Sequence, residues 1–348
     1  MDIWRFRLFI VTFTFIMAAT PALANAEEPE STETTLDLPP LQKNNTGIAL
    51  LDDILNEVDL QHQTLSEQIV DFTEEIDTYF ISDDQERRIN YSHIQLGYRY
   101  TFYKDDPAQL DPVFQARVHL PRTQNRLTVE VSNNNPFAAS NDTAAASNSG
   151  SSNPVTQSET DQAINIGLGY ISEITEFFNI KLTGGTRLAT DRLKLFVNLQ
   201  LYRKFFFDKW SMHLSEDLYR DNIVFNRSTA QMLFERRISE DQLFRSITKN
   251  IYYFDLGYTQ NHQTFYLLDR LSSRDAMIYQ VGSMWEKPLD LLDYKLENYY
   301  YMVRYSRKIY RDWLFIEVAP QVHYLREEDF NPKPLISLQF TAFFGNNK

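Results

Sequence analysis

The sequence predicts a mainly β protein, an antiparallel transmembrane β-barrel of about 12–14 strands preceded by one amphipathic α-helix. Three observations lead to this fold class. The chain is rich in aromatic residues although it is polar on average. Apolar and polar residues alternate along most of the chain after residue 87. The last alternating segment ends at Phe344, four residues before the C-terminus.

The composition excludes several classes of protein. A mean hydropathy of −0.42 argues against a bundle of membrane-spanning helices, as does the lack, after residue 24, of any apolar run near the ~18 residues that a spanning helix needs. Aromatic residues make up 14% of the chain, as expected of strands that are apolar only on alternate positions. The absence of cysteine excludes disulfides, thiolate catalysis, cysteine-ligated zinc and lipoprotein acylation.

The acidity of the chain belongs to its N-terminal part. Residues 1–86 hold 18 of the 47 acidic residues and three of the 34 basic ones, which leaves 29 acids and 31 bases, a net charge of +2, for residues 87–348. This balance predicts no nucleic-acid partner.

Residues 1–26 are predicted to be a signal peptide. Arg5 and Arg7 precede a short apolar run from Leu8 to Ala19, and small residues suited to cleavage follow. An uncleaved anchor is the alternative. Residues 27–46 are polar, acidic and proline-bearing, and are predicted to form a disordered leader. The remaining domains are an acidic periplasmic helix at 47–86 and an outer-membrane β-barrel at 87–348.

The helix is predicted from apolar residues at alternating spacings of four and three. Its seam comprises Leu51, Leu55, Val58, His62, Leu65, Ile69, Phe72, Ile76 and Phe80. We interpret His62 as an ordinary seam residue, because no second metal ligand lies three or four residues away on that face. The helix carries many acids and no Lys or Arg, which disfavours pairing with its own copy. It is expected to pack on the barrel mouth or on a less acidic partner, with a solvated acidic face.

Strands are expected where the period becomes two. They lie near 89–104, 112–121, 125–132, 162–171, 176–187, 191–205, 209–219, 223–237, 243–259, 263–270, 275–286, 297–309, 313–325 and 334–344. A soluble sandwich would show the same alternation. Strand lengths of about ten residues and aromatic residues at strand ends, such as Tyr299, Tyr301 and Tyr305, favour a membrane barrel.

The two sides of the barrel are predicted from its connections. Turns at Pro121–Asn125 and Arg311–Asp312 would be periplasmic, and the long polar segment from Asn133 to Gln162 would be an extracellular loop. The basic cluster of Arg304, Arg307, Lys308 and Arg311 would then lie on the periplasmic side, snorkelling at a strand end rather than binding lipopolysaccharide phosphates.

The last strand, Ile336 to Phe344, resembles the terminal-strand signal of Gram-negative outer-membrane proteins, which usually ends on an aromatic residue, whereas Gly345 to Lys348 follow here. This resemblance implies the barrel-assembly machinery as a partner through that strand. Outer-membrane lipid and lipopolysaccharide would surround the barrel.

The order of features also resembles one group of proteobacterial outer-membrane proteins without an assigned function. The likeness covers most of residues 51–344 and rests on short motifs: a helix ending in Asp77-Thr-Tyr-Phe80, a strand ending in Leu120-Pro121, and a hairpin at Tyr310 to Phe315. The resemblance implies the fold and an outer-membrane location. It implies no active site.

Candidate site residues are the polar members of the alternating segments. Arg99, Arg117, His119 and Lys194 are expected to face the lumen. His93 and His119 could form an acid–base pair, but mixed polar side chains in a hydrated lumen explain them better, because no third catalytic group is positioned. His213 and Ser215 share a face without the sequence context of outer-membrane lipid hydrolases. No catalytic residue, metal site or cofactor is therefore predicted.

The leading functional hypothesis is a passive channel or structural barrel, in which the helix acts as a plug or a docking element. An outer-membrane hydrolase of lipid or lipopolysaccharide is one alternative. The other is a binding module whose residues 47–86 recruit a periplasmic protein.

Overall fold

The computed structural model describes the barrel and part of the helix. It covers residues 52, 55–64, 66, 92–104, 106–120, 126–133, 164–175, 178–188, 193–222, 226–287 and 293–345. The predicted signal peptide, the leader, the turn at 121–125 and residues 134–162 of the predicted extracellular loop lie outside these ranges.

The barrel has fourteen strands, at the upper end of the expected range. They are β1 (His93–Tyr103), β2 (Gln109–His119), β3 (Leu127–Ser132), β4 (Ile164–Thr175), β5 (Phe178–Leu188), β6 (Leu193–Phe207), β7 (Trp210–Asp221), β8 (Asn226–Arg237), β9 (Gln242–Tyr253), β10 (Tyr258–Arg270), β11 (Asp275–Lys287), β12 (Lys295–Tyr310), β13 (Leu314–Leu325) and β14 (Pro332–Gly345). A 3-10 turn, η3 (Arg326–Glu328), precedes β14.

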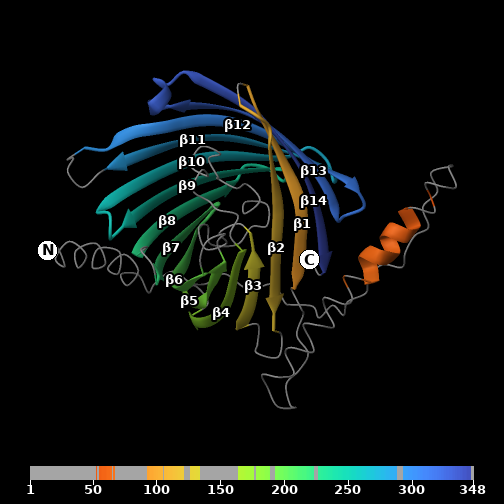
Figure 1. Cartoon of the computed structure of the whole chain (residues 1–348), viewed down its shortest axis with the longest axis horizontal. Helices are drawn as coiled ribbons and strands as arrows, with labels where there is room; N and C mark the ends of the chain where they lie inside the picture. Colours follow the sequence, from red (N-terminus) through yellow and green to blue (C-terminus); the bar gives the residue numbers. More distant parts are fainter. Residues whose placement is uncertain are drawn as a thin grey trace, which may run out of the picture. The chain divides into compact units, whose positions relative to one another are not determined.

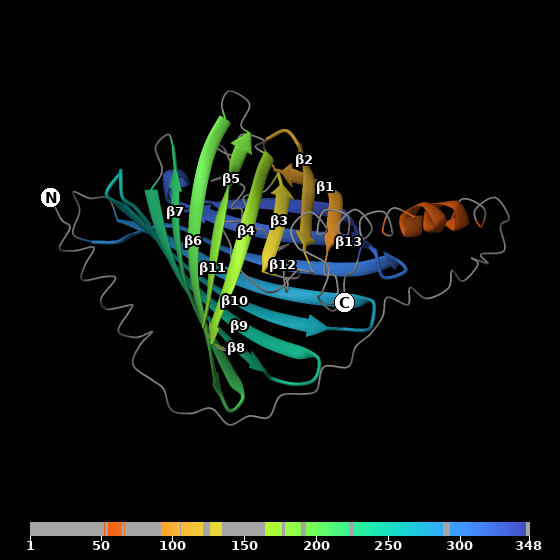
Figure 2. The ribbon, with the colours of Figure 1, turned by 90° about the horizontal axis from the view of Figure 1, so that it is seen from below.

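Each strand pairs antiparallel with its neighbours in sequence, and β1 pairs with β14 to close the barrel. Figure 1 shows the sheet curving through all fourteen strands, and in Figure 2 strands of opposite walls cross steeply, as tilted barrel strands do. β1 begins and β14 ends at the same end of the barrel, where His93 lies opposite Gly345. From the sequence, this end is expected to face the periplasm, the usual place for both ends of a single-chain barrel.

The alternation predicted from the sequence sets the two faces of the wall. In β6, Leu193, Leu195 and Val197 are each more than half exposed on the outer face. Between and beyond them, Phe196 and Asn198 face inward and are buried. At the far tip of the wall, Tyr299 stacks on Tyr324 with ring centroids 4.6 Å apart, as an interfacial aromatic girdle requires.

Glycines make room for aromatic rings on the inner face. At Gly184 and Gly185, β5 pairs with both neighbouring strands without a register shift. A Cβ on Gly185 would overlap the Phe196 ring and the backbone of β4, and a Cβ on Gly282 would overlap the Tyr300 ring. These glycines therefore allow close approach rather than a bend.

The β9–β10 hairpin was misplaced by the sequence analysis. β9 ends at Tyr253 and β10 begins at Tyr258, with Gly257 at a φ of 60° in the turn, whereas the expected break lay at residues 260–262. Aromatic residues continue across the turn and hid it from the alternation pattern. The other predicted strands each coincide with one observed strand, apart from shifts at their ends.

The predicted helix is observed over residues 55–64, and most of the rest of 47–86 lies outside the described residues. Its barrel-facing side matches the predicted seam only in part. The seam residue His62 contacts the barrel, together with Asp59 and Ser66 from outside the seam, whereas the seam residue Val58 is 39% exposed. Among the described residues, no helix has both the length and the apolarity needed to cross a membrane.

Candidate functional site

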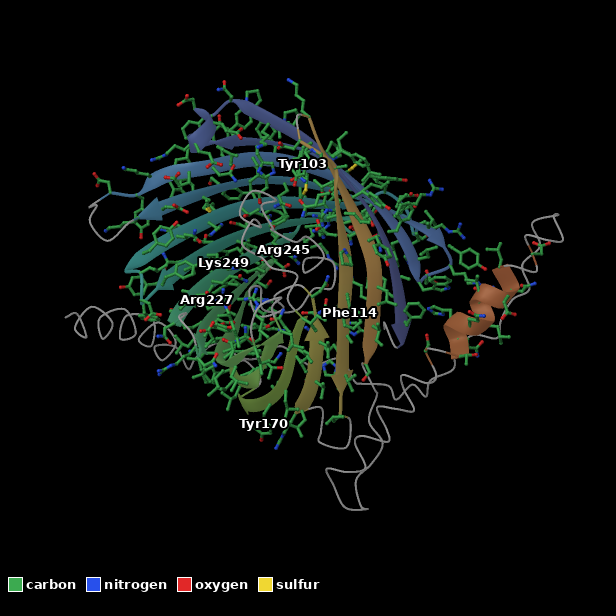
Figure 3. All side chains as sticks on the ribbon, viewed as in Figure 1. Tyr103, Phe114, Tyr170, Arg227, Arg245 and Lys249 are labelled. Carbon is green, nitrogen blue, oxygen red and sulfur yellow. The ribbon has the colours of Figure 1, made fainter. Side chains whose placement is uncertain are left out.

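The inner wall is the polar surface of the barrel and the candidate site. Its hydrogen bonds and ion pairs run sideways from strand to strand, which contributes to the burial of side chains such as Gln95, Thr183 and Gln280. Figure 3 shows side chains lining the whole circumference. The strand register places all four predicted lumen-facing residues on this face: Arg99, Arg117, His119 and Lys194.

Glu130 in β3 is the centre of one ion-pair cluster. Its Oε1 lies 3.2 Å from Nε of Arg117 in β2 and 2.9 Å from Nζ of Lys181 in β5. The carboxylate is nearly inaccessible, so the two cations compensate a charge that would be costly to bury alone. Arg117 therefore lies on the inner face, as predicted, but its charge is largely committed to Glu130.

Arg99 in β1 belongs to a second cluster, which extends across the pairing of β1 with β14. Its Nε donates a 2.8 Å hydrogen bond to Oε1 of Gln339, and it lies within electrostatic range of Arg304 and Glu317. Arg304 is 6% exposed, and its Nη1 has no hydrogen-bond partner among the described residues. Arg99 therefore lies near one other guanidinium, that of Arg304, and near two carboxylates, those of Glu317 and Asp111.

A third cluster lies on β6 to β9. Asp217 accepts hydrogen bonds from the amides of Asn198 and Gln200, and Arg227 and Lys249 interact with it electrostatically. Arg245 forms an ion pair with Glu235. Figure 3 labels Arg227, Arg245 and Lys249 along this part of the wall. The sequence analysis did not select these three residues, although the same period-two alternation places them on the inner face.

Basic residues outnumber acidic ones on the inner face. The register places on it the bases Arg99, Arg117, Lys181, Arg187, Lys194, Lys204, Arg227, Arg237, Arg245, Lys249, Arg270, Lys295, Arg304, Lys308 and Lys333, and the acids Asp111, Glu130, Asp217, Asp221, Glu235, Glu286 and Glu317. The electrostatic potential inside the barrel is therefore positive over much of the wall.

The histidines and serines weighed for hydrolysis do not form a triad in the described structure. Ser92 donates to the backbone carbonyl of His119 and accepts from its backbone N–H, a structural tie between β1 and β2. His213 and Ser215 both face inward from β7, and the His213 ring meets Tyr202 edge-on. Within the described ranges, no group of three or more His, Cys, Asp or Glu side chains could hold a metal ion.

The helix adds a fourth polar cluster, at the rim where β1 begins and β14 ends. Asp59 Oδ2 lies 2.5 Å from Nη2 of Arg311, in the β12–β13 turn, and accepts a 2.7 Å hydrogen bond from the Tyr310 hydroxyl. Asp59 is 3% exposed, so the expectation of a solvated acidic face is wrong at this residue. The prediction that Arg311 only snorkels at a strand end is also wrong, because it binds the helix.

His62 packs beside this ion pair. Its ring stacks between Trp313, with centroids 4.4 Å apart, and Phe344, with centroids 4.9 Å apart. Nε2 lies 2.7 Å from the carbonyl oxygen of Phe343. Burial lowers the pKa of His62 below its ordinary value, although the Phe343 carbonyl and the Asp59 carboxylate oppose the shift. The docked imidazole is therefore neutral near pH 7 and donates its Nε2 proton to this carbonyl.

Comparison with solved structures gives barrels of the outer membrane. The KdgM porin matches with a TM-score of 0.33 at 8% identity, covering 71% of this chain and 98% of its own. OmpT of Vibrio cholerae matches with a TM-score of 0.45 at 9% identity, covering 76% and 100%. OprD of Pseudomonas aeruginosa gives 0.41 at 9% identity, covering 76% and 98%. Likeness at this level says nothing about activity.

The chain matches no protein-family model and no curated protein sequence. Its own geometry, a closed barrel of fourteen antiparallel strands with a mainly apolar outer face and a polar inner face, is that of a transmembrane β-barrel.

Proposed function

We propose that this protein is a narrow passive channel of the outer membrane that favours anions. The observation that carries the proposal is the excess of basic side chains on the inner wall. A lumen lined by one sign of charge raises the local concentration of counter-ions and repels co-ions, and this sets ion selectivity without a binding site. The lateral pairing and burial of the inner side chains favour a narrow passage.

The test is the reversal potential of single channels in a planar bilayer with a potassium chloride gradient. The expected result is small conductance steps and a reversal potential of the sign set by chloride. A cation-selective potential would contradict the anion preference. Absence of conductance in refolded, heat-modifiable protein would contradict the channel itself.

The helix is proposed to act as a docking element at the rim rather than as a plug. The barrel residues that it contacts are Tyr310, Arg311, Trp313 and the end of β14 from Phe343 to Gly345, all at the rim. Tyr310 and Phe344 belong to the outward-facing set of their strands. Deletion of residues 47–86 is therefore expected to leave the conductance steps unchanged. Steps that appear only after the deletion would contradict docking and support a plug.

A periplasmic protein partner is a second proposal for the same helix. In the docked helix, Val58 is 39% exposed and Leu60 is 51% exposed, so apolar side chains remain open to a partner. Capture of one periplasmic protein by the full-length barrel, and its loss in a Leu60→Ser variant that keeps Asp59 and His62, would support recruitment. Equal recovery from both proteins would oppose it.

Outer-membrane location and assembly through β14 stay proposals. They are supported by the closed barrel and by the alternating outward set Ile336, Leu338 and Phe340 in the last strand. Recovery of the protein in the outer-membrane fraction in a surfactant-resistant, heat-modifiable form tests the location. Loss of that form after Phe340→Asp, with Gln339→Asn as the inward-facing control, tests the role of the strand in assembly.

A further inference from the structure

The outer face of β8 to β11 carries a polar patch at the level where the rest of the barrel is apolar. The register directs outward Ser246, Thr248 and Asn250 of β9 and Thr259, Asn261 and Gln263 of β10. Ser228 of β8 and Ser283 of β11 lie beside them on the same face. We call these eight residues the polar patch. Its neighbours along the strands are apolar, such as Phe265 and Val281.

The remaining wall shows what a lipid-facing surface of this barrel is made of. On β4 the outward residues are Ile164, Ile166, Leu168 and Tyr170, each 40–47% exposed. β1, β6 and β14 are equally apolar outside. The polar patch therefore differs from the apolar outer face of these other strands.

Thr248 and Gln263, the central pair of the patch, lie at mid-height of the wall. One row of directly paired residues runs from Arg203 in β6 through Leu214, Met232, Thr248, Gln263, Ser283 and Tyr299 to Tyr324 in β13. Arg203 is near the periplasmic end of β6, and Tyr324 is next to the last residue of β13, at the opposite end. Thr248 and Gln263 are in the middle of that row, at the depth of the hydrocarbon.

Polar side chains at that depth are costly in contact with lipid, because acyl chains offer no hydrogen bonds. Some of these polar side chains form hydrogen bonds with one another within the patch. Thr248 donates to Oε1 of Gln263 at 2.6 Å, Gln263 donates to Ser246 at 3.0 Å, and Asn250 donates to Oδ1 of Asn261 at 2.7 Å. Oδ1 of Asn250 and Nδ2 of Asn261 have no partner among the described residues.

The Asn250–Asn261 pair thus presents one acceptor and one donor side by side. Exchange of the two amide orientations would leave the same combination. A surface with one donor next to one acceptor is complementary to itself across a two-fold axis, where each copy donates to the other. The eight residues are uncharged, and the carboxylate beside them, Glu216 of β7, accepts a hydrogen bond from Ser228 of the same chain.

We infer that the polar patch is the centre of a lateral contact between two copies of this chain in the membrane, with the amides of Asn250 and Asn261 paired across a two-fold axis. Apolar residues around the patch remain in contact with lipid or with the second copy. The inference is independent of what passes through the barrel.

Single cysteines test this contact, because the chain contains none of its own. Thr248→Cys lies in the patch, and Leu168→Cys lies outward on β4 as the matched control. Both proteins are treated in intact outer membranes with a short bismaleimide. The inference expects a product of twice the chain mass from Thr248→Cys and none from Leu168→Cys. Only single-chain mass, a product of another mass, or equal dimer from both positions overturns it.

A second pair of variants tests the hydrogen bonds themselves. Asn250→Leu with Asn261→Leu removes the two amides that the inference pairs across the axis, whereas Leu168→Val with Ile166→Leu changes only apolar surface. Size-exclusion chromatography with light scattering in a mild surfactant should give a dimer for the native protein and the second double variant, and a folded monomer for the first. A native protein that is monomeric would overturn the inference, as would a dimer that survives in the first variant.

Discussion

The carboxylate of Asp59 accepts a hydrogen bond from the hydroxyl of Tyr310, a residue 251 positions further along the chain. The neighbouring Arg311 adds an ion pair to the same oxygen. Arg311 has a φ of 44°, so the tight β12–β13 turn presents Tyr310 and Arg311 together. A short helix of moderate intrinsic stability is thereby held on the barrel by an ion pair whose carboxylate is buried.

Replacement of Asp59 by Asn should loosen the helix from the barrel. Arg311, whose side chain is 30% exposed, would lose the buried carboxylate of Asp59 as its counter-charge, and a charge-assisted hydrogen bond of this kind contributes about 2 kcal/mol. Hydrogen exchange of the amides of residues 55–64 should therefore become roughly tenfold to thirtyfold faster. Glu57→Gln is the control, because Glu57 is exposed and its carboxylate contacts only Gln61 in the hydrogen bonds described. Equal exchange in both variants would contradict the role of Asp59.

Docking of the helix should weaken at acidic pH through His62. Burial holds the docked pKa below the ordinary value near 6.5, so the undocked helix takes up a proton that the docked one does not. The loss of docking stability begins as the pH falls through about 6.5 and is complete below the lowered pKa of His62 in the docked helix. Asp59 and Arg311 face the same ring, with opposite effects on its charge.

The measurement is the exchange rate of the helix amides between pH 7.5 and pH 5, corrected for intrinsic chemistry. His62→Phe keeps the stack on Trp313 and Phe344 but cannot take up a proton, so its docking should be independent of pH over this range. A His62→Phe protein with the same pH dependence as the native one would assign the effect to another group.

Anion preference should increase when Glu130 is neutralised. Glu130→Gln frees Arg117 and Lys181 from their shared carboxylate while the side-chain shape is kept. The reversal potential in a salt gradient should move further toward that of chloride. Lys249→Gln, on the other side of the lumen, should move it the opposite way. Shifts in the same direction for both variants would contradict an electrostatic lumen.

Gly282→Ala should destabilise the barrel. The Tyr300 ring lies over Gly282. Gln280 donates a 2.6 Å hydrogen bond to the Tyr300 hydroxyl, which holds the ring in place. Because an added Cβ would overlap the ring, we expect a loss of about 1–3 kcal/mol of stability. Gly184→Ala is the matched control, since its nearest atom would be 4.0 Å away. Urea titration followed by heat-modifiable migration compares the two.

The period-two pattern was sufficient to predict the strands, because each strand has one wet and one apolar face. It failed at the β9–β10 hairpin, where Tyr252, Tyr253 and Tyr258 carry the aromatic pattern past the turn. A glycine at residue 257 was the available turn signal.

The contact face of the helix was beyond local sequence patterns. Leucine and valine spacing predicted a seam through Val58, yet Asp59 is buried because Arg311 and Tyr310 lie at the rim. That pairing depends on the closed barrel, which brings residues of the twelfth and last strands to the helix. The polar patch was missed for another reason: Ser246, Thr248 and Asn250 alternate with Ile247, Lys249 and Ile251, so polarity alone did not reveal which set faces lipid.

The closure between β1 and β14 has a consequence for the order of assembly. All other strand pairs join neighbours in sequence and carry little loop-closure entropy, whereas the β1–β14 pair joins residues about as far apart as the barrel allows. The slow step of folding is thus expected to be this one seam. The helix contacts the end of β14. Its amides would therefore become protected from hydrogen exchange only after β1 and β14 have paired, and the rate at which this protection appears reports the final step of folding.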